Sequence, residues 1–136
     1  MNARATRLTH NNARYRWIGE RTHGQTKRLI ARAKLLVVSS KIEGGASVIS
    51  EALVSNTPVL ATRISGNVGM LGKNFSGLFS EGNANQLRQL LHRSETEQSF
   101  YRQLKNECRT LSKKFRPARE KATWNRTLSQ MFNPIP

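Results

Sequence analysis

The stretch that decides the fold is residues 35–62, LLVVSSKIEGGASVISEALVSNTPVLAT. It begins with an apolar run at residues 35–38, typical of a strand covered on both faces of a parallel sheet. A Gly-Gly turn, a helix over about residues 46–54 and a second apolar strand from Pro58 follow. The order strand, helix, strand predicts an α/β domain with a parallel sheet.

The same alternation continues on both sides of this stretch. Upstream, a short strand is expected at residues 15–18, ending at Gly19, and a helix at residues 26–33. Downstream, we expect a glycine-rich loop at residues 65–72, a short strand at 76–79, and a helix capped by Asn83 with Gln86 as reciprocal partner.

Two helices are expected at the C-terminal end. One carries an apolar stripe at helical spacing, which predicts that Cys108 is packed and inert. Pro117 suits the first turn of the other. The stripe consists of Phe100, Leu104, Cys108, Leu111 and Phe115, and the last helix carries Trp124, Leu128 and Met131.

The predicted fold class is therefore α/β, a Rossmann-like three-layer α/β/α arrangement with a mainly parallel sheet and C-terminal helices. The chain of 136 residues is long enough for one sizeable core. Residues 1–14 show neither strand nor helix periodicity, so we expect a basic tail or the remnant of an upstream segment. Residues 15–136 form the expected domain.

Composition excludes several kinds of site. All eight acidic residues are glutamates, so a metal site built on aspartates is excluded. One cysteine and three well-separated histidines give no zinc-ligand spacing, and we expect neither a metal nor a cofactor. A single cysteine fits a reducing compartment, so we expect a cytoplasmic location. The longest apolar run, residues 35–38, is far too short to span a membrane.

Positive charge is concentrated at the two ends of the chain. The net charge is +15, and residues 1–34 and 97–136 carry most of the excess. A basic domain that binds nucleic acid or an acidic partner is one alternative, although no interleaved aromatic, helix-turn-helix or RNP pattern supports sequence-specific binding. Solvated basic faces are the other alternative.

A candidate ligand site lies between the two decisive strands. In open parallel sheets, ligands bind beyond the carboxyl ends of the strands. Gly44 and Gly45 allow close approach of the backbone, and the first amides of the next helix favour phosphate oxygens. If the helix starts near Gly45, it rises roughly 9 Å to Glu51, so Glu43 and Glu51 bracket the helix start along its axis, which suits a diphosphate with a sugar on each side. A tight turn with two solvated glutamates explains the same spacing.

The glycine-rich stretch after the second strand is a weaker candidate. Gly66, Asn67 and Gly69 follow a buried strand, where a ligand loop would lie. A plain surface loop explains the glycine spacing equally simply.

Residues 39–72, SSKIEGGASVISEALVSNTPVLATRISGNVGMLG, resemble the donor-binding segment of family-four retaining glycosyltransferases of the GT-B type. That segment has two glutamates separated by seven residues, then Ala, a turn and Pro-Val. The resemblance implies a catalytic role for Glu43 at the donor sugar, ribose binding by Glu51 and a base pocket lined by Gly19. The remaining donor-binding residues it implies are Gly44, Gly45, Ala46, Ser47 and Val48.

The resemblance also implies what the chain contains and what it lacks. Residues 15–135 correspond to the later part of the family's C-terminal half, without the N-terminal acceptor domain and without the family's phosphate-binding Arg and Lys. Arg63 or Lys41 are candidates to approach the phosphates. Gly45 and Ala46 stand where the family usually has an aromatic residue and Gly, which looks closer to a subgroup that includes selenosugar synthases.

The functional hypothesis is therefore a UDP-sugar-binding portion of a retaining glycosyltransferase that works with an N-terminal half on an unknown acceptor. The alternatives are the basic binding domain described above and an inactive folded remnant of a truncated transferase. We expect a homo-oligomer, because a sheet edge next to the strand at residues 15–18 or the strand at residues 35–38, without its native neighbours, tends to find a substitute. Binding to nucleic acid, if present, is expected to be non-specific.

Overall fold

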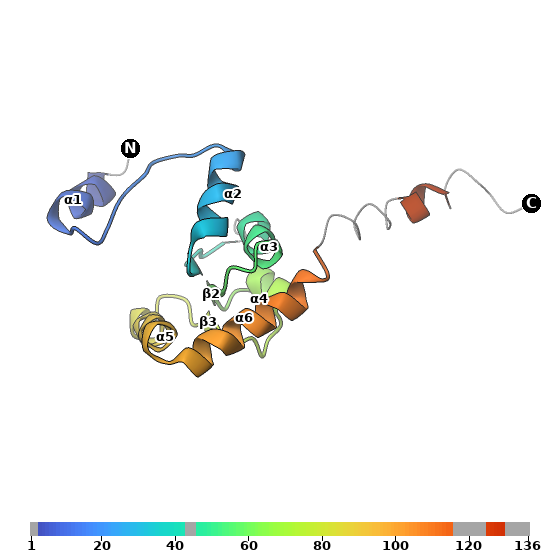
Figure 1. Cartoon of the computed structure of the whole chain (residues 1–136). Coiled ribbons are helices and arrows are strands. Elements are labelled where there is room, and N and C mark those ends of the chain that lie inside the picture. Colours follow the sequence, from blue (N-terminus) through green and yellow to red (C-terminus); the bar gives the residue numbers. More distant parts are fainter. Residues whose placement is uncertain (1–2, 43–45, 116–124, 130–136) are drawn as a thin grey trace, which may run out of the picture.

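The computed structural model describes residues 3–42, 46–115 and 125–129 (Figure 1). The predicted order strand, helix, strand over residues 35–62 is confirmed, and the fold class is α/β. The elements are, in order, α1 (Ala3–Asn11), α2 (His23–Arg32), β1 (Leu36–Val38), α3 (Ala46–Val54), β2 (Val59–Thr62), α4 (Ser65–Leu71), β3 (Leu78–Phe79), α5 (Ala84–Thr96) and α6 (Gln98–Ser112).

Within the described ranges the sheet is parallel, with three strands in the order β1-β2-β3. Val38 of β1 lies opposite Ala61 of β2, which in turn lies opposite Leu78 of β3. The Thr62 hydroxyl donates a hydrogen bond of 2.6 Å to the Ser40 carbonyl. This bond joins the carboxyl ends of β1 and β2 at one edge of the sheet, where a ligand of an α/β protein binds.

The core lies between the sheet and the helices behind it. All four residues of β2 are buried, as are Ile49, Ala52 and Leu53 of α3. Helix α6 adds Phe100, Leu104 and Cys108, in agreement with the stripe found in the sequence. This packing fixes α3 against the sheet, so the residues on its opposite border have defined positions.

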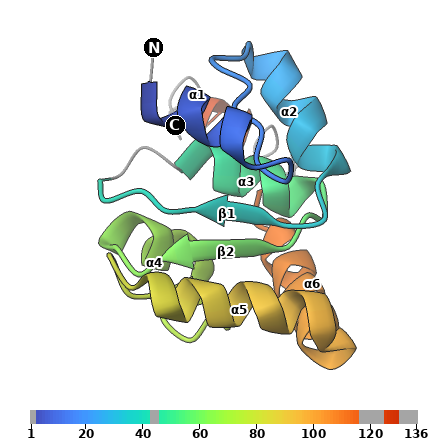
Figure 2. The ribbon, with the colours of Figure 1, turned by 90° about the vertical axis from the view of Figure 1, so that its left-hand side faces the viewer.

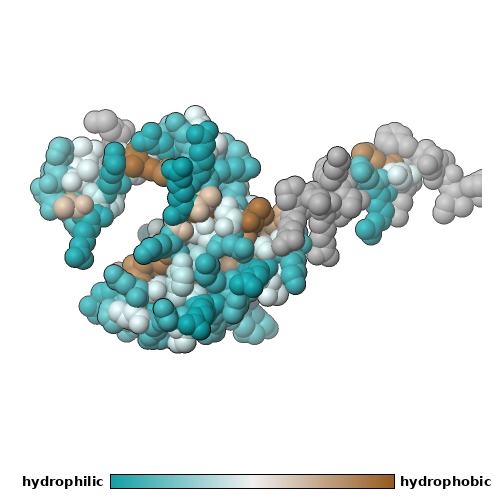
Figure 3. Space-filling view, viewed as in Figure 1, coloured by the Kyte–Doolittle hydropathy of each residue, from teal (hydrophilic) through white to brown (hydrophobic). Residues whose placement is uncertain are grey.

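The other face of the sheet is only partly covered. Figure 2 shows α3 above and behind β1 and α5 below β2, while the ribbons of β1 and β2 stay visible in front. Val37 on β1 is 38% exposed. The prediction that this run is covered on both faces is therefore wrong for β1, because the face of β1 that carries the Val37 side chain is left open. Figure 3 shows other small hydrophobic areas among the hydrophilic side chains of the described surface.

Three stretches differ from the local predictions. Residues 15–18 form no strand, and the Trp17 amide donates to the Thr9 hydroxyl of α1 at 2.8 Å, away from the sheet. Residues 1–14, for which periodicity predicted no regular structure, contain α1. Residues 65–71 form α4 rather than a glycine-rich loop.

Capping bonds set the starts of α2 and α5. The Thr22 hydroxyl accepts from the Gln25 amide, and the Gln25 side chain accepts from the Thr22 amide, a complete capping box. The Asn83 side chain accepts from the Gln86 amide, as predicted. The predicted reciprocal bond is wrong, because the Gln86 side chain accepts from Ser80 instead.

The predicted last helix is only partly within the described residues. Residues 125–129 are helical and include Leu128, while Pro117, Trp124 and Met131 lie outside the described residues.

The single thiol of the chain, Cys108, is expected to resist modification in the folded protein. Its side chain is fully buried, and burial raises the pKa of the Cys108 thiol to about 11, against a weaker lowering by a hydrogen bond with Val59 and a further raising by Glu107. Titration with a disulfide reagent at pH 8 should show no fast reaction without urea and one reactive thiol in urea. Fast reaction of the native chain would contradict this packing.

The same thiol adds a pH dependence to stability. The pKa of the Cys108 thiol is higher in the folded chain than in the unfolded chain. The buried neutral thiol therefore contributes fully to the free energy of unfolding below the unfolded pKa, about 8.5, and this contribution is lost as the pH rises toward 11.

Candidate functional site

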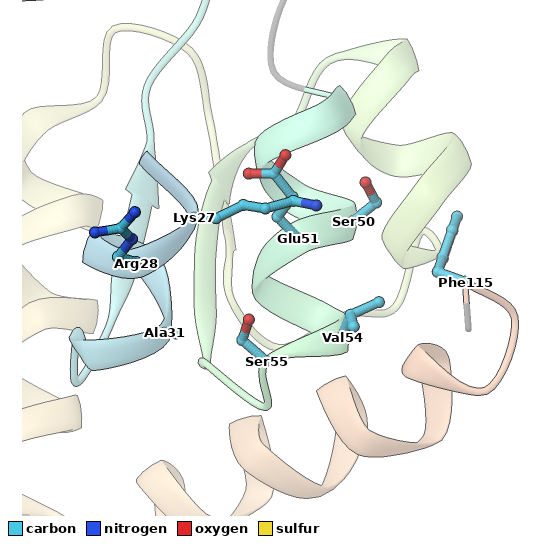
Figure 4. A pocket seen from close by; sticks show the side chains of 8 residues that line it. All are labelled: Lys27, Arg28, Ala31, Ser50, Glu51, Val54, Ser55 and Phe115. Carbon is cyan, nitrogen blue, oxygen red and sulfur yellow. The ribbon is translucent and has the colours of Figure 1, made fainter. Parts of the chain in front are cut away.

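A cavity of about 500 Å³ lies between α2, α3 and the end of α6 (Figure 4). Its walls combine both signs of charge with hydroxyl groups and apolar side chains, which is the composition of a site for a polar ligand. The lining residues are Lys27, Arg28, Ala31, Ser50, Glu51, Val54, Ser55 and Phe115.

Glu51 is the acidic residue of this cavity. Its side chain is only 11% exposed, and Oε1 lies 3.2 Å from Nε2 of His23. Its second oxygen, Oε2, is buried and has no hydrogen-bond partner among the described residues. Buried carboxylate oxygens are normally paired, because an unpaired one has lost its water without compensation. Oε2 therefore requires a donor from outside this part of the chain.

The sequence of α3 explains where Glu51 lies. Ile49, Ala52 and Leu53 face the core, so Glu51, between them in sequence, is held at the border of the buried stripe. The spacing predicted this border position. The carboxylate is close enough to the core to lose solvent and close enough to the cavity to meet a ligand.

Two further residues of the site come from α2. His23 and Lys27 are one helical turn apart, so they share the face of α2 that lies against α3. Figure 4 shows the Lys27 side chain extending from α2 toward α3, while the Arg28 guanidinium points away from Glu51. The sequence analysis did not identify His23 or Lys27 as site residues. Their spacing of four residues indicates that they share one face of the helix, but the packing of α2 against α3 cannot be predicted from the sequence.

The model of the glycosyl transferases group 1 family matches residues 4–110 of the chain. The chain belongs to this family. The match runs from α1 into α6 and includes the whole parallel sheet and the lining residues of the Glu51 cavity except Phe115. No curated protein matches the chain. Group 1 membership gives sugar transfer as the general function, and it supports the family resemblance of residues 39–72.

Several of the predicted donor-binding residues come just before or at the start of α3 in the sequence. Glu43, Gly44 and Gly45 lie outside the described residues. Ala46 and Ser47 form the first turn of α3, and the Ser47 carbonyl accepts from the Ser50 hydroxyl at 2.8 Å.

Val48 and Gly19 have positions that fit structural roles. Val48 packs partly buried against the core. Gly19 has a φ of +68°, a conformation that favours glycine at this bend before α2. Their contact with a donor stays a prediction.

The predicted ligand residues Gly66, Asn67 and Gly69 lie on α4 of the glycosyltransferase domain. Asn67 is buried, and its amide donates to the Thr62 carbonyl at 3.0 Å and to the Thr62 hydroxyl at 3.2 Å. These bonds occupy the Asn67 donor group at the end of β2. The structure thus gives Asn67 a role in fixing the sheet edge, while ligand contact by the three residues stays a prediction.

The two cations suggested for the phosphates lie in different surroundings. The Arg63 guanidinium donates to the Lys73 carbonyl at 2.9 Å, which ties it to the turn after α4. Lys41 is exposed after β1. Neither lines the Glu51 cavity, whereas Lys27 does.

Across the ranges that the structure describes, no three metal-ligating side chains gather into a group. Within the same ranges, the helices are too short or too polar to cross a membrane.

Proposed function

We propose that the Glu51 cavity binds the nucleotide of a UDP-sugar donor, as the donor side of a retaining glycosyltransferase whose acceptor is held by an N-terminal half. The observation that carries this proposal is the buried, unpaired Oε2 of Glu51. A ribose offers two adjacent hydroxyl donors, and bonds from hydroxyls to a carboxylate are charge-assisted and strong. A ribose hydroxyl would thus donate a hydrogen bond to Oε2 of Glu51, the buried side-chain oxygen that has no partner among the described residues.

The charges around Glu51 suit the rest of the donor. Lys27 lines the same cavity and brings a positive charge to the side where a diphosphate would lie. The backbone amides of the first turn of α3, at Ala46 and Ser47, favour phosphate oxygens. When the sugar leaves, negative charge builds on the diphosphate, and fixed amides and cations stabilise it best. Under this proposal, Glu43 contacts the sugar, as the family resemblance implies.

Glu51→Gln is expected to weaken UDP binding about tenfold or more, because it replaces charge-assisted hydrogen bonds with weaker neutral ones. The measurement is a titration with UDP followed by the backbone amide shifts of residues 46–51. Glu95→Gln on α5 is the matched control, since Glu95 is exposed and distant in the fold. We expect Glu51→Gln to keep or raise the melting temperature, because an uncharged amide costs less to bury than a carboxylate.

The proposal has two clear failures. One is an absence of amide shifts in residues 46–51 at millimolar UDP. The other is equal UDP affinity of Glu51→Gln and the wild-type chain, which would leave the unpaired oxygen without a ligand role.

A second candidate function is supported by another cavity, of about 320 Å³, beside α2. Among the described residues, none of its four arginines pairs with a carboxylate. Tyr15 and Trp17, which were expected in a strand, are 37% and 43% exposed in the adjoining segment. Unpaired arginines next to exposed aromatic rings are the pattern of a single-strand nucleic-acid site. The lining residues are Arg16, Ile18, Arg21, Gln25, Arg28, Leu29 and Arg32.

A further inference from the structure

We propose that His23 is a positioning residue, which holds the Glu51 carboxylate so that Oε2 faces the ribose and thereby makes the cavity selective for a nucleotide with intact ribose hydroxyls. This inference rests on the nucleotide-binding function proposed above and adds to it a residue that the family resemblance does not include. It follows from three features: the contact with Glu51, the rigidity of the helix start that carries His23, and the weakness of this contact as a source of stability.

The contact engages only one of the two oxygens of Glu51. Nε2 of His23 lies 3.2 Å from Oε1, and Oε2 remains buried and unpaired among the described residues. Without a partner on Oε1, the carboxylate could rotate about its last torsion, which has a broad profile. With Oε1 held at ion-pair distance from the imidazole, that rotation is restricted and Oε2 keeps one direction. A fixed acceptor loses less entropy when it binds a hydroxyl than a rotating one does.

The start of α2 holds His23 in place. His23 is the first residue of α2, directly after the cap Thr22. The two bonds between Thr22 and Gln25, of 3.1 and 3.2 Å, close a capping box around this turn. The Thr26 amide adds a bond of 2.9 Å to the Thr22 carbonyl. The imidazole therefore projects toward α3 from a fixed turn rather than from a loose end.

Stability alone does not explain this contact. The His23 side chain is 72% exposed, and ion pairs with one solvated partner contribute little to folding. The carboxylate that His23 contacts keeps its other oxygen buried without a partner among the described residues, which is unfavourable without a ligand. A contact that fixes such a carboxylate in place is explained if a ligand pairs with the buried oxygen.

The test measures the affinity of the chain for UDP and for 2′,3′-dideoxyuridine diphosphate, which lacks the ribose hydroxyls. His23→Ala is expected to weaken UDP binding about fivefold, the value of one ordinary hydrogen bond, and to leave dideoxy-UDP binding unchanged. His23→Gln keeps an N–H donor and should recover most of the UDP affinity. In a Glu51→Gln background, His23→Ala should have no further effect, because His23 acts through the carboxylate. His10→Ala on α1 is the histidine control.

The possible results separate this inference from the proposed function. Equal UDP affinity of His23→Ala and wild type, with Glu51→Gln still weakened, would overturn the role of His23 alone. A loss in His23→Ala that persists with dideoxy-UDP or in the Glu51→Gln background would also overturn it, since His23 would then contact the ligand directly. Absence of UDP binding by the wild-type chain would overturn both proposals. Melting curves of each variant exclude unfolding as the cause.

Discussion

Replacing Leu104 with Ala is expected to lower the free energy of unfolding by about 3 kcal/mol or more. Leu104 is fully buried on α6. Its Cδ2 lies 3.2 Å from the position that a Cβ would take on Gly77, so α6 packs directly on the backbone that leads into β3. The Gly77 carbonyl accepts from Ala61 of β2, which fixes that backbone. The cavity left by Leu104 therefore cannot close by movement of the strand, and the loss falls toward the upper part of the usual range.

Urea unfolding followed by circular dichroism measures this loss. Leu91→Ala on α5 is the control, because Leu91 is 40% exposed and its truncation should change stability by about 0.5 kcal/mol or less. Similar losses in the two variants would mean that α6 is not packed on the sheet. A small loss for Leu104→Ala would contradict the core described above, and with it the fixed position of α3.

Prediction from the sequence succeeded where local signals agree with tertiary packing. Helix α3 was predicted over the residues that form it. The signals were the Gly-Gly pair before it in the sequence and the helical spacing of its apolar residues. The buried strand β2 was predicted from the apolar run that follows Pro58. Glu51 at the border of α3 follows from the same spacing. These features depend on neighbours within a few residues.

Prediction failed where packing against other elements determines the local structure. Gly66 and Gly69 each disfavour a helix by about 1 kcal/mol, yet residues 65–71 form α4. The buried Asn67 and Leu71 of α4 gain more from packing than the glycines lose. The exposure of Val37 depends on which elements cover that face of the sheet, and this packing cannot be predicted from the apolar run alone.

The candidate site shows the same division. The position of Glu51 on its helix could be predicted, but its partner could not, since His23 lies 28 residues earlier and meets it only because α2 packs on α3. The expectation of a homo-oligomer stays a prediction. It rests on β1, which lies at the edge of the described sheet and could pair with a second chain.

Neutralising the four arginines beside α2 is expected to remove most of any affinity of the chain for single-stranded nucleic acid. If all four contact phosphates, they account for about three units of the slope of log affinity against log salt. Wild-type affinity should then fall roughly fiftyfold between 50 and 200 mM salt through these contacts alone. The variant changes Arg16, Arg21, Arg28 and Arg32 to Gln, and fluorescence anisotropy with a labelled oligonucleotide at several salt concentrations measures the slope.

A matched variant separates this cavity from the general charge of +15. It changes four exposed cations on and after α5 and α6, namely Arg88, Arg102, Arg109 and Lys114, to Gln and lowers the net charge equally. If the arginines beside α2 form a site, their loss should reduce the salt slope by about three units and the control by far less. Equal reductions in the two variants would show that net charge alone attracts the nucleic acid, and would leave the nucleotide cavity at Glu51 as the remaining functional site. A Trp17→Ala variant completes the test, because stacking on an exposed ring should contribute about 1 kcal/mol or more at every salt concentration.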